Sequence, residues 1–466
     1  MNEQETKPRI LISLNNGWII RNWIYTGILD DLAEKFDVMV LTPVKDDPEF
    51  RDILSKRKLS IKVSLLHELE INPFIKMIRG IKDKLFYEIH GLETQKIKRF
   101  DRRYNLFLKG ASLFILALSK LPGANRIVLL LERFDNLLNR KKIYEDALHS
   151  FHPDLFISTH PFSNTERKVI IEAYREKIPV LASILSWDNI FNKGLLPLFF
   201  DKIIVWSQIQ EDRILSYYPE YNSKHIAISG IPNFDIYRSK EFEDFKRHDY
   251  LKSIKIDPEY RVLVYCTGPP SLFPKEPEIV DILIKNMDKG SIPDNCHLLV
   301  RLHPHDDFER YEPFLNHKRV TIFNSSLDKQ SRDTFTWIPP EDEIFGLMAM
   351  LKASDLCINI ASTTSLDAAA CGIPIINVVF DGYKDEKYLG SNRRFYDFTH
   401  YKDVVKTGAV KLVYSEKELI HAINHYLKNP SSDKEKRGKL VSEQCWKLDG
   451  KSSERVVKII SDFLTK

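Results

Sequence analysis

The chain has 466 residues, which is too long for one hydrophobic core, so we expect two or three domains. Hydrophobic residues make up 43% of the chain and charged residues 29%, a balance that excludes a fibrous or disordered protein. The net charge of +4 is small for this length and gives no reason to expect nucleic acid as a partner.

The polar start MNEQETKPR lacks the basic and apolar regions of a secretory signal. No apolar run approaches the ~20 residues that a membrane-spanning helix needs. The five cysteines form no CxxC pair, and we expect buried, reduced thiols. These features predict a cytoplasmic protein.

Short apolar runs rich in β-formers alternate with helical stretches along the chain. Such runs that are separated by helices are typical of parallel strands covered on both faces. The sequence therefore predicts an α/β fold with two doubly wound, Rossmann-like domains, and ligands bind such folds beyond the carboxyl ends of the strands. The predicted strands are 9–15, 36–43, 60–66, 154–159, 180–185, 202–207 and 225–230, then 261–268, 297–304, 321–324, 355–361 and 374–380.

The Gly and Pro residues of GIPNFDIY interrupt this pattern and set the domain boundary near residue 230. We expect an acceptor domain over 1–230, a donor domain over 231–430 and a helical tail over 431–466. A cleft between the two domains is the expected place for substrates.

Residues 70–150 interrupt the alternation and are predicted to form a helical insertion in the N-terminal domain. Between 76 and 109 there are ten Lys or Arg residues against four Asp or Glu, interleaved with apolar side chains. A basic amphipathic segment can lie on an anionic membrane surface, so 70–120 is a candidate for contact with the inner membrane face. The alternative, a solvated insertion packed on the N-terminal domain, stays open.

Polar residues follow three strands of the N-terminal half. Asn16 and Gly17 come after the first strand and are expected to face the acceptor, as is Lys193. A general base must reach the acceptor hydroxyl, and His160 and Asp188 are the candidates because each comes in the loop after a strand. In the alternative interpretation Asp188 caps a helix and His160 packs on the proline that follows it.

Two strand ends of the C-terminal half carry residues that suit a phosphate. Thr267 and Gly268 end the run at 261–268, where Gly allows backbone to approach a ligand. Arg301 and His303 end the next run, and the planar fork of Arg matches phosphate oxygens.

A third strand end, in LCINIASTTSLDAAACGIP, places hydroxyls at a helix start. The N–H groups there favour an anion, so Ser362, Thr363 and Thr364 are predicted to bind a diphosphate. Asp367, in the first turn, is expected to accept from ribose hydroxyls, unless these residues only cap the helix. Trp337 and Ile338 are expected to flank the base, with core packing as the alternative for Trp337.

The motifs RLHP (301–304), ASDLCINIASTTSLDAAACGIPIINV (353–378) and DGKSSERVVKII (449–460) resemble the GT-B class of nucleotide-sugar-dependent glycosyltransferases. The stretch 186–207 is similar to one in bacterial transferases that build surface polysaccharides. The resemblance implies two facing Rossmann-like domains, with the hydroxyl turn on the donor diphosphate and Asp367 on the ribose. The class commonly has Glu there, and Asp is one methylene shorter.

The resemblance further implies a metal-independent glycosyltransferase without a cofactor. Its donor is a nucleotide-sugar, and its acceptor is a hydroxyl of a cell-surface glycan or a lipid-linked molecule. Arg301 and His303 are expected to stabilise the leaving group. Three alternatives stay open: a CDP-polyol polyol-phosphate transferase, a nucleotide-sugar 2-epimerase, and a catalytically idle protein that binds sugar-nucleotides or glycans.

Overall fold

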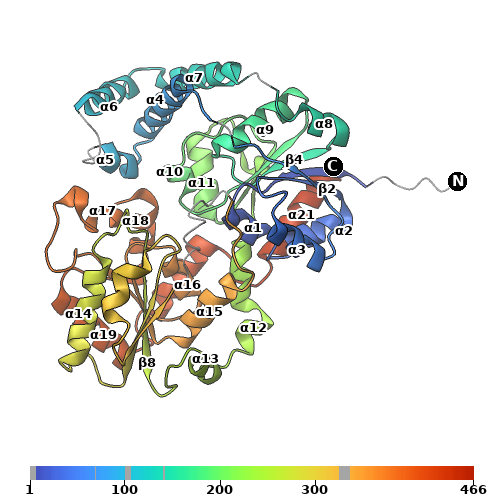
Figure 1. The fold of residues 1–466 in the computed structure, drawn as a ribbon. Helices are drawn as coiled ribbons and strands as arrows, with labels where there is room; N and C mark the ends of the chain where they lie inside the picture. The colour runs from blue at the N-terminus through green and yellow to red at the C-terminus, as the bar shows by residue number, and fades with distance from the viewer. Residues whose placement is uncertain (1–6, 69, 100–105, 140–141, 325–335, 466) are drawn as a thin grey trace. The chain divides into compact units, whose positions relative to one another are not determined.

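The computed structural model describes residues 7–68, 70–99, 106–139, 142–324 and 336–465. The chain forms two compact units (Figure 1). Unit 1 comprises 1–233, 333–341 and 451–466, and unit 2 comprises 234–332 and 342–450.

Unit 1 is built on a parallel sheet that has seven strands in the described residues, in the order β3-β2-β1-β4-β5-β6-β7. The strands are Arg9–Ser13 (β1), Asp37–Thr42 (β2), Lys62–Leu65 (β3), Leu155–Ser158 (β4), Val180–Ser183 (β5), Lys202–Val205 (β6) and Ile226–Ile228 (β7). The helices are Gly17–Trp23 (α1), Ile28–Lys35 (α2), Pro48–Lys56 (α3), Pro73–Ile89 (α4), Glu93–Arg99 (α5), Leu106–Ser119 (α6), Ala124–Leu138 (α7), Glu145–Phe151 (α8), Asn164–Arg175 (α9), Asn189–Asn192 (α10), Gln208–Tyr217 (α11) and Ser452–Leu464 (α21).

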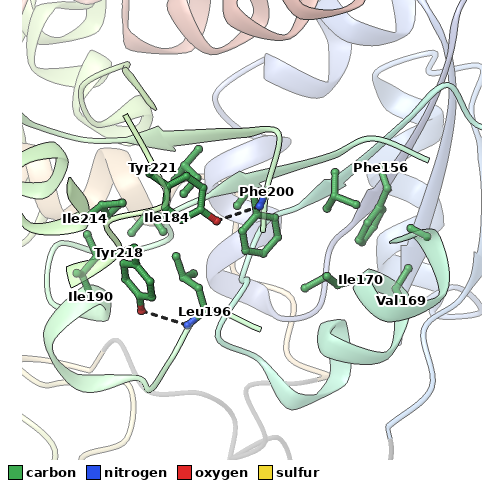
Figure 2. Close-up of a cluster of buried hydrophobic side chains, with 14 of the residues drawn as sticks. Phe156, Val169, Ile170, Ile184, Ile190, Leu196, Phe200, Ile214, Tyr218 and Tyr221 are labelled. Carbon is green, nitrogen blue, oxygen red and sulfur yellow. Dashed lines mark hydrogen bonds between the residues drawn. The ribbon is translucent and has the colours of Figure 1, made fainter. Parts of the chain in front are cut away.

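One face of this sheet packs on a cluster of aromatic and aliphatic side chains, shown in Figure 2. Two tyrosines of the cluster also bind backbone. The hydroxyl of Tyr218 accepts from the N–H of Leu196 at 3.2 Å, and that of Tyr221 accepts from the N–H of Phe200 at 2.9 Å. These bonds fix the loop that follows α10, which carries the candidate Lys193.

Unit 2 has a second parallel sheet, with six strands in the described residues, in the order β10-β9-β8-β11-β12-β13. The strands are Arg261–Cys266 (β8), Cys296–Arg301 (β9), Val320–Phe323 (β10), Leu356–Asn359 (β11), Ile375–Val378 (β12) and Val410–Val413 (β13). The helices are Lys240–Glu243 (α12), Arg247–Ser253 (α13), Glu276–Asp288 (α14), Glu343–Ala353 (α15), Thr364–Ala370 (α16), Arg393–Tyr396 (α17), Thr399–Lys406 (α18), Glu416–Lys428 (α19) and Lys434–Leu440 (α20).

These two sheets confirm the predicted α/β fold with two Rossmann-like domains. All twelve predicted strands are present, and β13 is the strand that the sequence did not reveal. β13 is an edge strand of four residues with an exposed Lys411, so it lacks the continuous apolar run of its neighbours. Strand order reverses between β1 and β4 and between β8 and β11, which are the positions where such folds bind ligands.

Two later segments of the chain belong to unit 1, and the predicted boundaries differ there. Ile338 lies in the core that covers the other face of the first sheet. Val456, Val457 and Ile460 of α21 lie in the same core. Burial of their apolar surface explains why 451–466 packs on unit 1 rather than forming a separate tail.

The helical insertion consists of α4 to α7, and α4 packs against α6 and α7 (Figure 1). Two of the basic residues that suggested a lipid-facing helix, Arg79 and Lys82, are instead buried. Arg79 binds Asp135 at 2.9 Å, and Lys82 pairs with Glu132. A buried cation needs a counter-charge, so these positions face α7.

Candidate functional site

The loop after β9 in unit 2 is held by a buried carboxylate that the sequence analysis missed. Asp306 accepts from the hydroxyl of Thr267 at 2.8 Å and from that of Tyr311 at 2.9 Å. The Thr267 hydroxyl in turn accepts from the backbone N–H of His303 at 2.8 Å. The structure therefore brings together the predicted site residues Thr267 and His303, which lie after β8 and β9. The hydroxyl of Thr267 is used in hydrogen bonds that hold the loop after β9.

His303 is neutral and oriented. Its Nδ1 accepts a hydrogen bond from the backbone N–H of His305 at 3.0 Å. Burial lowers the pKa of His303 to about 4, and the neighbouring His305 and Arg301 act in the same direction. A neutral imidazole whose Nδ1 accepts carries its proton on Nε2. His303 is therefore set to donate from Nε2, for example to a phosphate oxygen.

Arg301, at the end of β9, has partners within unit 2. Its Nη2 donates to Glu343 at 3.4 Å, and its guanidinium lies 5.9 Å from the ring centre of Phe323. The residue is buried. Arg301 thus places a positive charge at this strand end, and the carboxylate of Glu343 orients its guanidinium group.

Gly268 is required by packing. A Cβ on Gly268 would lie 2.3 Å from the Cδ2 atom of Phe273, so the ring leaves no space for a side chain there. The backbone N–H of Gly268 donates to the buried carboxyl of Glu276 at 2.8 Å. Gly268 therefore shapes the loop after β8, and close approach of its backbone to a ligand stays a prediction.

The four hydroxyls after β11 divide into two groups. Ser365 is buried and lies 2.9 Å from the hydroxyl of Tyr401. Ser362 and Thr364 are half-buried and Thr363 is exposed. The Ser362 hydroxyl also accepts from the N–H of Thr364 at 3.2 Å. Three of the four hydroxyls thus remain accessible at the switch point between β8 and β11.

Asp367 is buried behind this turn. One of its oxygens accepts from the hydroxyl of Tyr237 at 2.6 Å, and Tyr237 is itself fully buried in Pro232–Arg238 (η2). The structure thus shows Asp367 fastening η2 to α16. Contact with a ribose stays a prediction.

In unit 1, three candidates from two loops lie near one another. Burial and the charge of Lys193 lower the pKa of His160, while Asp188 raises it, with a resulting value of about 4. Asp188 accepts from the Ser186 hydroxyl at 2.7 Å and from the Asn192 side chain at 3.2 Å. Its side chain makes no capping bond to α10, so the capping alternative does not explain it. A neutral imidazole next to an oriented carboxylate suits general base chemistry.

The other unit 1 candidates serve the fold. Asn16 caps α1, because its Oδ1 accepts from the N–H of Ile19 at 3.1 Å. A Cβ on Gly17 would lie 2.6 Å from the Trp337 ring. Trp337 and Ile338 are buried in unit 1, and Trp337 packs edge-on against Trp18 with ring centres 4.9 Å apart. Both are therefore core residues, which corrects their assignment to the donor base. Gly17 is required by the packing of Trp337.

Glu166 of α9 is a buried carboxyl that holds the His160 loop. It accepts from the Ser158 hydroxyl at 2.5 Å and from the backbone N–H of His160 at 3.0 Å. Ser163 caps α9, and Glu166 lies in the first turn of this helix. Complete burial raises the pKa of Glu166 to about 7, against the effect of these hydrogen bonds.

Substituting Glu166→Gln is expected to flatten the pH dependence of stability between pH 4.5 and about 7. The folded-state pKa is raised, so the protonated carboxyl stabilises fully below the unfolded pKa, and this contribution is lost as the pH rises through about 7. The amide keeps an acceptor for His160 but does not ionise. Thermal unfolding of the native protein and the Glu166 variant across this pH range tests the prediction, with Glu220→Gln at an exposed position as the control. Parallel profiles for the native protein and the Glu166 variant would contradict the assignment.

One group of possible metal ligands occurs among the described residues. Glu145, His149 and Glu176 place their ligand atoms within 4.8 Å of one another. They lie on α8 and just beyond α9 and are largely exposed. We assign them no role in the site.

Residues 197–462 match the sequence profile of the CDP-glycerol:poly(glycerophosphate) glycerophosphotransferases. This match covers more than half of the chain and includes every candidate of unit 2. The chain belongs to this family. As a glycerophosphotransferase family member it is a transferase, as predicted, although the family's named reaction moves a glycerol phosphate rather than a hexose. No curated protein matches the sequence.

Solved structures similar to this glycerophosphotransferase family member confirm the GT-B fold. A putative UDP-N-acetylglucosamine 2-epimerase from Listeria monocytogenes is 11% identical, with a TM-score of 0.58 over 99% of this chain and 98% of that one. UDP-GlcNAc 2-epimerase from Neisseria meningitidis bound to UDP-GlcNAc is 12% identical, with a TM-score of 0.54 over 97% and 100%. The glycotransferase of kitacinnamycin is 12% identical, with a TM-score of 0.51 over 99% and 100%. At this identity the likeness concerns the fold alone.

Proposed function

We propose that this protein transfers a polyol phosphate of the glycerol phosphate type from a cytidine diphosphate-linked donor to an acceptor hydroxyl. The observation that carries the proposal is the family match across 197–462, which includes Thr267, His303 and the hydroxyl turn at 362–364. The open alternative of polyol-phosphate transfer from the sequence analysis thereby becomes the preferred one.

The chemistry needs a base and a group that stabilises the departing nucleotide. The acceptor hydroxyl attacks the phosphorus that carries the polyol, and its proton passes to a base, for which His160 and Asp188 are the candidates. The bond from that phosphorus to the bridging oxygen breaks, and CMP leaves with this oxygen. The Nε2–H of His303 and the hydroxyls of Ser362 and Thr363 are suited to bind its phosphate.

Glycosyl transfer is the second candidate, and the GT-B fold supports it. In that reaction the bond to the anomeric carbon breaks, so a nucleoside diphosphate leaves instead of CMP. The UDP and UDP-GlcNAc named for two similar structures support a nucleoside diphosphate as part of the donor. In both reactions we place the acceptor among cell-envelope glycans or lipid-linked molecules, on the cytoplasmic side, and propose no metal requirement.

The product identifies the reaction. Purified protein is incubated with CDP-glycerol or UDP-GlcNAc and a synthetic glycerol phosphate oligomer, with and without EDTA, and nucleotides are separated by chromatography. Release of CMP that depends on the oligomer supports the proposal. Release of UDP would establish glycosyl transfer, and formation of the 2-epimer of UDP-GlcNAc would establish an epimerase. Nucleotide binding without turnover of any donor would favour a binding protein.

Substituting His303→Ala is expected to weaken binding of CDP-glycerol by about 10- to 100-fold, because it removes a hydrogen bond to a charged phosphate. Thermal shift measures this, since a ligand at 100 times its dissociation constant adds about 2.7 kcal/mol of stability. The exposed His421→Ala on α19 is the matched control. An unchanged shift in the His303 variant would remove His303 from the donor site.

A further inference from the structure

Large apolar side chains are exposed on one part of unit 1. Phe114 is 70% exposed and Leu130 is 61% exposed. They belong to a group that we call the apolar face, which lies on α4, α6 and α7 and the turn between α6 and α7. Its members are Phe74, Met77, Leu113, Phe114, Leu121, Leu129, Leu130, Phe134, Leu137 and Leu138.

Helix α7 is the reverse of an ordinary surface helix, which turns its charged side to water. Its two acids, Glu132 and Asp135, are buried and face α4 and α9. There they pair with the buried cations Arg79, Lys82 and Arg167. The ion pairs fix which side of α7 points inward, so its leucines and Phe134 are held outward.

Along α7 and the turn that precedes it, the exposed charges beside the apolar face all have one sign. Within 110–139 the charged side chains that are exposed are Lys120, Arg126 and Arg133. Contiguous exposed apolar surface marks an interaction site in soluble proteins. An apolar face with a basic edge matches an anionic lipid surface, where the apolar side chains enter the acyl boundary and the basic ones meet the headgroups.

We propose that the apolar face of α4, α6 and α7 docks on an anionic lipid bilayer. A second copy of this chain fits less well, because a symmetric contact would bring the three basic residues toward their own copies. Among the described residues, no single helix is long and apolar enough to cross a bilayer. Gly110–Ser119 and Ala124–Leu138 meet that requirement only together and are bent by 118°. The described geometry therefore favours a surface contact.

Helix α4 connects the docking face to the loop of Lys193. Asp83 of α4 accepts from the backbone N–H of Leu195 at 3.2 Å. The left-handed Gly194 approaches the same carboxylate, since a Cβ there would lie 3.0 Å from it. Docking therefore places the candidate base loop on an element anchored at the lipid surface, which suits an acceptor carried by lipid. This last point rests on the proposed function, whereas docking itself does not.

Flotation of the full chain with vesicles tests the docking. We expect it to float with phosphatidylcholine vesicles that contain phosphatidylglycerol, and much less with phosphatidylcholine alone. Phe114→Glu combined with Leu130→Glu should abolish flotation, and Leu315→Glu, at an exposed apolar residue of unit 2, should not. Arg126→Gln and Arg133→Gln should each weaken partitioning about fivefold.

Each outcome decides the proposal. Failure of the native chain to float with anionic vesicles would overturn it, as would flotation of the Phe114 and Leu130 double variant equal to that of the native chain. A dimer in lipid-free solution that the double variant converts to a monomer would assign the face to a second copy. If the double variant does not fold, the arginine variants carry the test, since their substitutions are on the surface. Thermal shift by CDP-glycerol is measured in parallel, so loss of docking and loss of donor binding are distinguishable.

Discussion

Replacing Asp135 by Ala is expected to lower the free energy of unfolding by about 3–5 kcal/mol, because it removes the counter-charge of the buried Arg79 and leaves Lys82 and Arg167 to share Glu132. Asp135 is fully buried and lies 2.9 Å from Arg79, 3.0 Å from Arg167 and 3.4 Å from Lys82. Burial alone would raise the pKa of Asp135, but Arg167, Arg79 and Lys82 hold it below its usual value. The stabilisation is therefore present above the usual carboxyl pKa and is lost as the pH falls.

Urea denaturation followed by circular dichroism measures this loss. A chain of two units can unfold in two steps, and the effect is expected in the transition of unit 1. The control is Asp146→Ala, at an exposed position of α8. Equal stability of the two variants would show that the cluster does not fix α7 to α4 and α9, and would weaken the explanation of the apolar face.

Replacing His160 by Ala is expected to lower the rate of transfer by about 10²- to 10⁴-fold, the usual contribution of a general base. The substitution spares the local fold, because Glu166 holds the backbone N–H of residue 160 rather than the ring. With a pKa of about 4, the ring of the native protein can accept a proton throughout the neutral range. CMP release under single-turnover conditions is the measurement.

The exposed His149→Ala on α8 controls for loss of a histidine in unit 1. The thermal shift by CDP-glycerol should be the same in the native protein and the His160 variant, since donor residues are assigned to unit 2. A His160 variant with native turnover would leave Asp188 as the candidate base, to be tested by Asp188→Asn.

The fold was predictable because its strands are continuous apolar runs that are separated by helices. Strand β13 was not predicted because the exposed Lys411 interrupts its apolar run at the sheet edge. The packing of Trp337 and Ile338 in unit 1 could not be predicted from the sequence either. Their sequence neighbours belong to unit 2, and only long-range packing decides which core buries them.

Position at a strand end supplied the candidates His160, Asp188 and His303 from the sequence, and their roles stay predictions. The acids that hold these loops were missed: Glu166, Glu276 and Asp306. Each is buried and bonded to backbone or to hydroxyls several residues away, and such pairing leaves no local pattern. The one available signal for Asp306 was the pair of acids that ends the stretch VRLHPHDD.

The return of the chain to unit 1 has a consequence for biosynthesis. Its core takes Ile12 and Val40 from the start of the chain, Ile338 from the middle, and Val457 and Ile460 from α21. Domains ordinarily fold as they emerge from the ribosome, N-terminal first. Here the residues of the first half that Ile338 and α21 cover stay exposed until these segments have been translated, so a nascent chain exposes that part of the interior through the synthesis of unit 2.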